Sequence, residues 1–242
     1  MKTMTKFFVF AAAFGAGALV TVQAQTIADW TFETTQPGVV DGPASPGAGV
    51  WITNILAEVG SGTASGFHAG AATYSSPAGN GSVRSFSSAL WAVGDFYQFE
   101  TSTLGLNNIT LSYDQVSSGT GPGTFQLAYS TDGVSFTSIG TTYTVLDNGL
   151  APNASWNATT ANPVYTFSDD LSAITAIDNA ATVYFRLIDS GTEDAAGTAN
   201  VGTGGTDRVD NFTVAQAVPE PASIALAGLG GLALLIARRR RS

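Results

Sequence analysis

Hydrophobic and polar residues alternate over short stretches of this chain, which is typical of β-strands with one buried face. The clearest stretch is 109–114, Ile-Thr-Leu-Ser-Tyr-Asp, in which every odd position is apolar. In 183–188, Val-Tyr-Phe-Arg-Leu-Ile, both faces carry apolar side chains, so we expect this strand near the centre of a sheet. Further strands are predicted at 28–33, 95–100, 143–146, 164–168 and 209–215.

The strongest local signal is the dipeptide Asp132-Gly133, which lies between two β-like stretches in 125–140. This dipeptide favours a two-residue hairpin turn, because both of its residues tolerate positive φ angles. Folding the chain about that turn places Tyr129 opposite Phe136, as an aromatic cross-strand pair.

One short helix is predicted at 170–177, where Leu171, Ile174 and Ile177 recur at helical spacing. The segments 36–50, 60–82 and 190–206 are rich in glycine, alanine, serine, threonine and proline, and are interpreted as loops. Many short strands separated by turn residues predict an all-β protein with a single antiparallel β-sandwich over residues 25–214.

The N-terminus has the three parts of a secretory signal peptide. Lys2 and Lys6 are followed by an apolar run over 7–20, and a small-residue pattern ending at Ala24 precedes Gln25. We therefore interpret residues 1–24 as a signal peptide cleaved between Ala24 and Gln25, with the export translocon and signal peptidase as partners.

The C-terminus has a second apolar segment over 222–237, which contains no charged residue. A helix of this length spans roughly 24 Å, slightly less than the ~30 Å hydrocarbon core of a bilayer, and is predicted to cross the membrane with some local adjustment. It follows a tether over 215–221 and precedes a basic tail over 238–242. The positive-inside rule places the tail, and with it the four arginines that stop translocation, in the cytoplasm: Arg238, Arg239, Arg240 and Arg241.

The sequence Val218-Pro219-Glu220-Pro221, the apolar segment and the arginine run together resemble the PEP-CTERM sorting signal of exported bacterial proteins. The resemblance implies an exosortase-type membrane protease as a partner, cleavage near the Pro-Glu-Pro stretch, and a place in or near extracellular polysaccharide. It implies a protein anchored in the inner membrane before processing and then present at the cell surface or outside the cell. An ordinary membrane anchor is the alternative, but it leaves Pro-Glu-Pro unexplained.

The body also resembles the jelly-roll sandwiches of PEP-CTERM proteins and carbohydrate-binding modules. The residues that carry this resemblance are the hairpin 129–136 and the closing strand 208–212. Both stretches are short, so the resemblance supports a jelly-roll-like fold more than it supports any particular ligand.

The body is strongly acidic once the two ends are set aside. Arg84, Arg186 and Arg208 are its only basic residues, whereas it holds every acidic residue of the chain except Glu220. Such a surface repels nucleic acid and anionic lipid, so neither is expected as a partner. The chain has no cysteine, which excludes disulfides, thiol nucleophiles and thiolate metal sites.

Candidates for catalysis are few. His68 is the only histidine, and we interpret it as an exposed loop residue. No G-x-S-x-G elbow surrounds any serine, so the sequence does not indicate a serine nucleophile. A pair of glutamates acting on a glycosidic bond would make the protein a secreted carbohydrate-active hydrolase. The candidates for this alternative are Glu33, Glu58, Glu100 and Glu193.

Acidic residues at 193–194, 207 and 210, with Asn211 beside them, are candidates for a structural calcium site, although no EF-hand spacing is present. The favoured interpretation is that Asp207 and Asp210 pair with Arg186 or Arg208 across strands, so no metal or other cofactor is expected.

Tryptophans are the remaining candidates for binding. Trp30 alternates with apolar neighbours and is assigned to the core, whereas Trp51 and Trp156 lie in loop-like surroundings. They are candidates for stacking on sugar rings, although packing in the core or at a hinge is the favoured interpretation. The sequence as a whole predicts an exported, non-catalytic protein that is structural or glycan-associated, with the hydrolase as the competing hypothesis.

Overall fold

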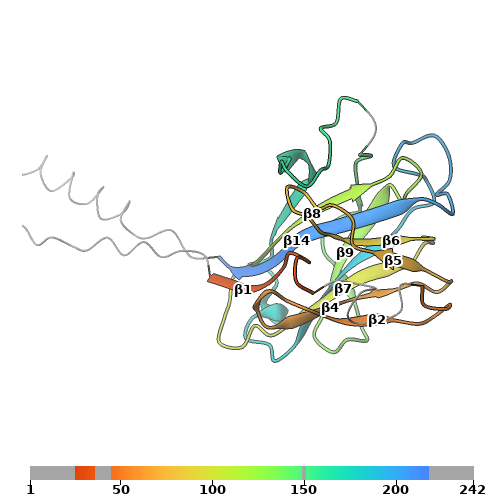
Figure 1. Cartoon of the computed structure of the whole chain (residues 1–242). Coiled ribbons are helices and arrows are strands. Elements are labelled where there is room, and N and C mark those ends of the chain that lie inside the picture. Colours follow the sequence, from red (N-terminus) through yellow and green to blue (C-terminus); the bar gives the residue numbers. More distant parts are fainter. Residues whose placement is uncertain (1–24, 36–44, 149–150, 218–242) are drawn as a thin grey trace, which may run out of the picture. The chain divides into compact units, whose positions relative to one another are not determined.

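Two antiparallel sheets of seven strands each lie face to face in the computed structural model (Figure 1). The structure describes residues 25–35, 45–148 and 151–217. The predicted signal peptide, membrane segment and basic tail lie outside these residues. Within them, no helix is both long and apolar enough to cross a membrane. The all-β sandwich predicted from the alternating pattern is confirmed.

The first sheet, sheet A, has the strand order β12-β8-β14-β1-β3, and β6 and β5 continue it beside the first half of β14. Its strands are β1 (Gln25–Trp30), β3 (Val59–Gly60), β5 (Thr73–Ser75), β6 (Phe86–Ala89), β8 (Ile109–Ser117), β12 (Thr166–Asp170) and β14 (Thr206–Gln216). β14 therefore includes the first two residues of the predicted tether.

The second sheet, sheet B, has the order β10-β9-β13-β7-β4-β2, with β11 also paired to β9. Its strands are β2 (Ile52–Leu56), β4 (Gly62–Phe67), β7 (Phe96–Thr101), β9 (Thr124–Ser130), β10 (Thr137–Ser138), β11 (Tyr143–Thr144) and β13 (Val183–Asp189). The central position predicted for β13 is confirmed, because it pairs with β7 on one side and β9 on the other.

β14 is the axis of sheet A and changes partner half-way along. One edge pairs with β8, while the other pairs first with β6 and then with β1. The change occurs at a bulge, where Asn211 has a φ of 51° and the register against β8 shifts between Asp210 and Thr213. Asparagine tolerates this left-handed conformation better than most residues. Asp210 fixes the bulge, because it accepts hydrogen bonds from the Asn80 amide and the Ser82 hydroxyl at 2.8 and 2.7 Å.

Aromatic rings connect the two sheets in the core. Phe99 of sheet B and Phe212 of sheet A stack with their ring centroids 3.6 Å apart and their planes nearly parallel. Trp30 meets both rings edge-on, at 5.3 and 5.9 Å, and its indole N–H donates to the Ile55 carbonyl at 3.1 Å. The predicted core position of Trp30 is confirmed, since its side chain is fully buried.

The segment 60–82 was expected to be a loop, but it contains β4 and β5. Two of its glycines leave room for aromatic rings that pack against β4. A Cβ atom at Gly62 would lie 2.7 Å from the Trp30 ring, and one at Gly66 would lie 2.6 Å from the Tyr74 ring. Two bulky rings therefore lie directly on β4, which explains why this strand carries residues that resemble a loop.

The predicted two-residue hairpin turn is wrong in its register. Tyr129 pairs with Thr137, and β9 and β10 are joined by the six residues 131–136. Asp132 organises this connection, because its Oδ1 accepts the backbone amides of Val134 and Ser135, both at 2.8 Å. These bonds satisfy the turn without a tight type I′ geometry, and Phe136 is left outside the strand pairing.

The helix predicted at 170–177 is also wrong, although its apolar positions are buried. The backbone continues the pairing with β8, since the Leu171 amide donates to the Ile109 carbonyl at 2.9 Å. Only a 3₁₀ turn, η2 (Thr175–Ile177), follows; a second, η1 (Pro163–Tyr165), precedes β12. Leu171 and Ile177 are buried, and Ile174 packs against the same core.

Replacing Phe212 by alanine removes one ring of the stack between the sheets. We expect the free energy of unfolding to fall by about 3–5 kcal/mol, as is usual for such a truncation in a packed core. Urea denaturation measures the change. Val134 is 84% exposed, so Val134→Ala is the matched control and should change stability by less than about 0.5 kcal/mol. Equal losses in the two variants would contradict the role given to the stack.

Candidate functional site

The outer face of sheet B carries a row of aromatic rings across three neighbouring strands. Phe67 of β4 pairs with Phe96 of β7, and Trp51 directly precedes β2 beside them. The ring centroids of Trp51 and Phe67 are 5.1 Å apart, and those of Phe67 and Phe96 are 5.4 Å apart. Trp51 is 37% exposed, so part of its ring is open to solvent.

Arg186 of β13 lies beside this row. Its Cζ is 3.8 Å from the centroid of the Phe96 ring and 3.6 Å from that of Phe136, so two aromatic faces stabilise the cation. The Nε–H donates to Gln98 Oε1 at 2.8 Å. Burial lowers the pKa of Arg186 to about 10, which still leaves the guanidinium charged at neutral pH.

Polar side chains continue the same face, in two further rows across β4, β7 and β13. One row runs from Ser65 through Gln98 to Arg186, and the next runs from Thr63 through Glu100 to Tyr184. A hollow of about 290 Å³ lies at the end of the second row, and its lining includes Leu56, Ser61, Thr63, Glu100 and Thr182. We call the residues Trp51, Phe67, Phe96, Phe136, Arg186, Ser65, Gln98, Thr63, Glu100 and Tyr184 the sheet B face.

Trp51 and Trp156, the two predicted stacking residues, are in different environments. Trp51 belongs to the sheet B face. Trp156 is 4% exposed, packs edge-on against Tyr165 at 5.5 Å, and donates its indole N–H to the Ala78 carbonyl at 2.7 Å. The stacking role suggested for Trp156 is therefore wrong, because its ring is part of a small secondary core.

The interpretation of His68 as an exposed loop residue is also wrong. Its side chain is 1% exposed, with Nε2 3.0 Å from the Ser88 hydroxyl and Nδ1 3.1 Å from Asp95. Although burial opposes ionisation of Asp95, hydrogen bonds from His68 and from the Ala69 and Ala92 amides lower the pKa of this carboxyl. The pair fastens the β4–β5 connection to the start of β7.

The acidic residues proposed for calcium are spread over separate hydrogen-bond networks. Asp207 is fully buried and accepts hydrogen bonds from Gln115 and Ser117, at 3.1 and 3.0 Å, instead of pairing with an arginine. Asp194 accepts the Thr198 amide at 2.8 Å. Across the residues that the structure describes, no group of three or more histidine or acidic side chains is arranged to hold a metal ion.

Two of the four glutamates of the hydrolase hypothesis accept hydrogen bonds from loop amides, and the other two lie on different elements. Glu58 accepts the amides of Thr31, Thr34 and Thr35, and Glu33 accepts the Arg84 amide at 2.7 Å. Glu100 belongs to the sheet B face, and Glu193 is exposed in the loop after β13. The hydrolase hypothesis remains a prediction.

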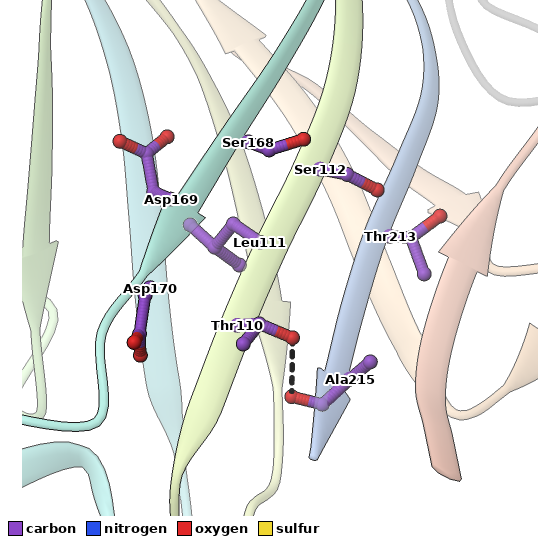
Figure 2. Close-up of a pocket in the computed structure, with 8 residues that line it drawn as sticks. All are labelled: Thr110, Leu111, Ser112, Ser168, Asp169, Asp170, Thr213 and Ala215. Carbon is purple, nitrogen blue, oxygen red and sulfur yellow. Dashed lines mark hydrogen bonds between the residues drawn. The ribbon is translucent and has the colours of Figure 1, made fainter. Parts of the chain in front are cut away.

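Sheet A has an open hollow of about 370 Å³ over β8, β12 and β14, drawn in Figure 2. Its lining consists of Thr110, Leu111, Ser112, Ser168, Asp169, Asp170, Thr213 and Ala215. The side chains in Figure 2 are short and include no aromatic ring. Because it has no ring to stack on and no buried polar group at its base, this hollow is a weaker candidate than the sheet B face.

Most of the sheet B face could not be identified from the sequence. Phe67 lay in a predicted loop, and Phe136 was assigned to strand pairing. The available signal was the position of Arg186, one of three basic residues in an acidic body, on a strand with apolar residues on both faces.

Comparison with protein families identifies a known motif in the C-terminal segment. The model of the PEP-CTERM protein-sorting motif matches residues 217–241. The chain carries a PEP-CTERM sorting motif. The PEP-CTERM motif indicates an exported protein that undergoes exosortase processing at the membrane before it reaches the surface. Val218, Pro219, Glu220 and Pro221 lie inside the match, together with the four arginines.

No curated protein matches the chain. Among solved structures, it resembles a CBM22-1–GH10 fragment of Clostridium thermocellum xylanase 10B complexed with xylohexaose, at 15% identity and a TM-score of 0.44. That match covers 81% of this chain and 29% of the xylanase chain. The K3 cleaved adhesin domain of Lys-gingipain from Porphyromonas gingivalis matches at 17% identity and a TM-score of 0.40, over 78% of this chain and 98% of the domain. At these levels the likenesses carry no argument about a ligand.

Buried aspartates with raised pKa values make stability depend on pH. Burial raises the pKa of Asp189 to about 6 and that of Asp210 to about 7, although each carboxyl accepts hydrogen bonds that act in the opposite direction. Asp95 and His68 face Asp189, and Asp114 faces Asp210. Because the folded state binds these protons more tightly than the unfolded chain, their contribution to stability is complete in acid and is lost as the pH rises through 6 and 7.

We expect the Tm to fall when the pH is raised from about 5 to about 8. Asp189→Asn should flatten this dependence, because the amide does not ionise. Asp170→Asn is the control, since Asp170 is exposed and its hydrogen bond from the Ser172 amide lowers its pKa. Calorimetry across this range measures the effect. A Tm that rises with pH, or an unchanged slope in Asp189→Asn, would contradict the assignment.

Proposed function

We propose that this exported protein associates with polysaccharide outside the cell through the sheet B face, in a non-catalytic role. The observation that carries the proposal is the partly exposed ring of Trp51, which continues into a row of aromatic rings on the face of a sheet. A sugar ring has one face of C–H groups, which packs on an aromatic face, and an edge of hydroxyl groups, which hydrogen-bond to polar side chains.

The polar part of the face supports the same ligand class. Glu100 and Tyr184 supply a carboxylate and a hydroxyl group beside the rings, and between them they accept and donate hydrogen bonds. Gln98 is buried beside Arg186, whose Nε–H it accepts. These side chains lie on paired strands, which fix their spacing before any ligand binds. The acidic body disfavours nucleic acid and anionic lipid as alternative ligands.

A non-catalytic role is supported by the glutamates. Glu58 already accepts hydrogen bonds from three loop amides, a structural task that leaves its carboxylate committed. Glu100 is the one glutamate that we place on the sheet B face, whereas glycosidic hydrolysis by the usual mechanism uses two carboxyl groups flanking one bond.

Sorting is the second part of the proposal. Signal peptidase removes residues 1–24 after passage through the translocon, and the segment 222–237 then holds the chain in the membrane with Arg238–Arg241 inside. The exosortase cleaves near Val218–Pro221 and releases the sandwich to the cell surface or matrix. The proposed cleavage position lies after the last strand of the sandwich, because β14 ends at Gln216, directly before the motif.

Removal of the Trp51 ring tests the sheet B face. We expect Trp51→Ala to weaken polysaccharide binding about tenfold, since a partly buried ring contributes roughly 1–2 kcal/mol. Trp51→Phe keeps a ring and should retain most of the affinity. A glycan array with the full chain selects the polysaccharide, and affinity electrophoresis measures both variants. Binding that survives in Trp51→Ala without loss would rule out this face as the site.

Replacement of Pro219, Glu220 and Pro221 by alanine tests the sorting step. The altered chain should stay in the membrane fraction at its uncleaved mass, because the exosortase no longer recognises it. Alanine at Thr141 and Thr142, two exposed residues of the sandwich, is the control and should leave processing unchanged. Fractionation and mass spectrometry give the result. Normal release of the Pro-Glu-Pro variant would show that the motif does not direct cleavage.

A further inference from the structure

A third hollow, of about 240 Å³, lies at the end of the sandwich where β13 stops and β7 begins. Its lining includes Trp91 and Val93 from the loop before β7, Asp189 and Thr192 from the end of β13 onward, and Asn200 and Val201 from the loop before β14. We call it the Asp189 pocket. It shares none of its lining residues with the sheet B face, so a ligand bound in this pocket would be independent of the proposed function.

Asp189 is an exception among the buried aspartates. Both carboxylate oxygens of Asp95, Asp207 and Asp210 accept hydrogen bonds from other groups. Asp189 is 1% exposed, and its Oδ1 accepts only the Gly191 amide, at 3.2 Å. Its Oδ2 is buried without a hydrogen-bond partner among the residues that the structure describes. Buried polar atoms are nearly always paired, so this oxygen calls for a donor from outside the chain.

The surrounding charges favour a positively charged donor. The Asp95 carboxylate faces Asp189 and raises its pKa, while the nearby His68 is already paired with Asp95. Asp189 in turn raises the pKa of the buried Asp207 carboxyl. A cation placed at Asp189 Oδ2 would offset the electrostatic penalty of this buried carboxylate, whereas a neutral donor would only complete a hydrogen bond.

The size and the lining of the pocket indicate which kind of cation fits it. A lone divalent ion needs several oxygen ligands, and the described residues contain no group of three or more acidic or histidine side chains arranged to supply them. The pocket is large enough for a small organic group, and Trp91, Val93 and Val201 give it apolar walls. Thr192 and Asn200 add oxygen acceptors at its sides.

We propose that the Asp189 pocket binds a primary ammonium group carried on a short carbon skeleton, with Asp189 Oδ2 as its main acceptor and Asn200 as a second. An amino-sugar residue and an alkylamine such as a lysine side chain share this chemistry. The carbon skeleton packs against Val93, Val201 and the edge of Trp91, while the ammonium group reaches the base of the pocket.

Isothermal titration of the full chain at neutral pH in amine-free buffer tests the proposal. The probes are glucosamine and butylamine, and their neutral counterparts are N-acetylglucosamine and 1-butanol. At least one amine should bind, and both neutral compounds should fail to bind. Stronger binding of glucosamine would identify an amino sugar as the source of the ammonium group, and stronger binding of butylamine would identify an alkylamine.

Asp189→Asn should weaken amine binding about tenfold or more, as expected for the loss of a charge-assisted hydrogen bond. Asp169→Asn, which changes a half-buried carboxyl over sheet A, is the control and should bind as the unaltered chain does. Asn200 is exposed, so Asn200→Ala should fold normally and bind several-fold more weakly. Failure of both amines to bind, equal binding of the neutral compounds, or unchanged affinity in both Asp189→Asn and Asn200→Ala would overturn the proposal. Loss of polysaccharide binding in Trp51→Ala tests the sheet B face separately.

Discussion

The stacking of Phe99 on Phe212, with Trp30 edge-on to both rings, is the contact on which the arrangement of the two sheets depends. Phe99 points inward from β7, so Phe96 and Gln98 necessarily point outward, because successive side chains of a strand face opposite sides. A shift of one residue in this register would turn Gln98 into the core and Phe99 out of it. The packing of the core therefore determines which side chains form the sheet B face.

The scarcity of basic residues determines which groups pair with the buried aspartates. With three arginines in the body, Asp207 and Asp210 are stabilised by neutral donors such as Gln115, Ser117 and Ser82. Such networks satisfy hydrogen bonds but do not neutralise charge, which is why burial raises the pKa of both aspartates. Asp189 has neither a positive partner nor a complete set of donors, which distinguishes it as a binding candidate rather than a structural residue.

Sequence patterns predicted the fold class, the strand at 109–114 and the central position of 183–188, because these features depend on local alternation. They failed where long-range packing decides the outcome. Gly62 and Gly66 resemble loop residues but lie in β4 to admit the rings of Trp30 and Tyr74. The Asp132 hydrogen bonds replaced the tight turn, and Phe136 thereby became available to Arg186. The sheet B face joins residues far apart in sequence, and among them only Trp51 is a candidate for sugar stacking on the sequence alone.

The central claim is that the aligned outer side chains of sheet B form the binding surface of an exported protein. Its most direct test is a chemical-shift map of the protein during titration with an oligosaccharide of the polysaccharide that it binds. The account predicts that the perturbed amides cluster on β2, β4, β7 and β13, around Trp51, Phe67 and Arg186. Perturbations confined to the sheet A hollow around Asp169, or spread evenly over both sheets, would contradict it.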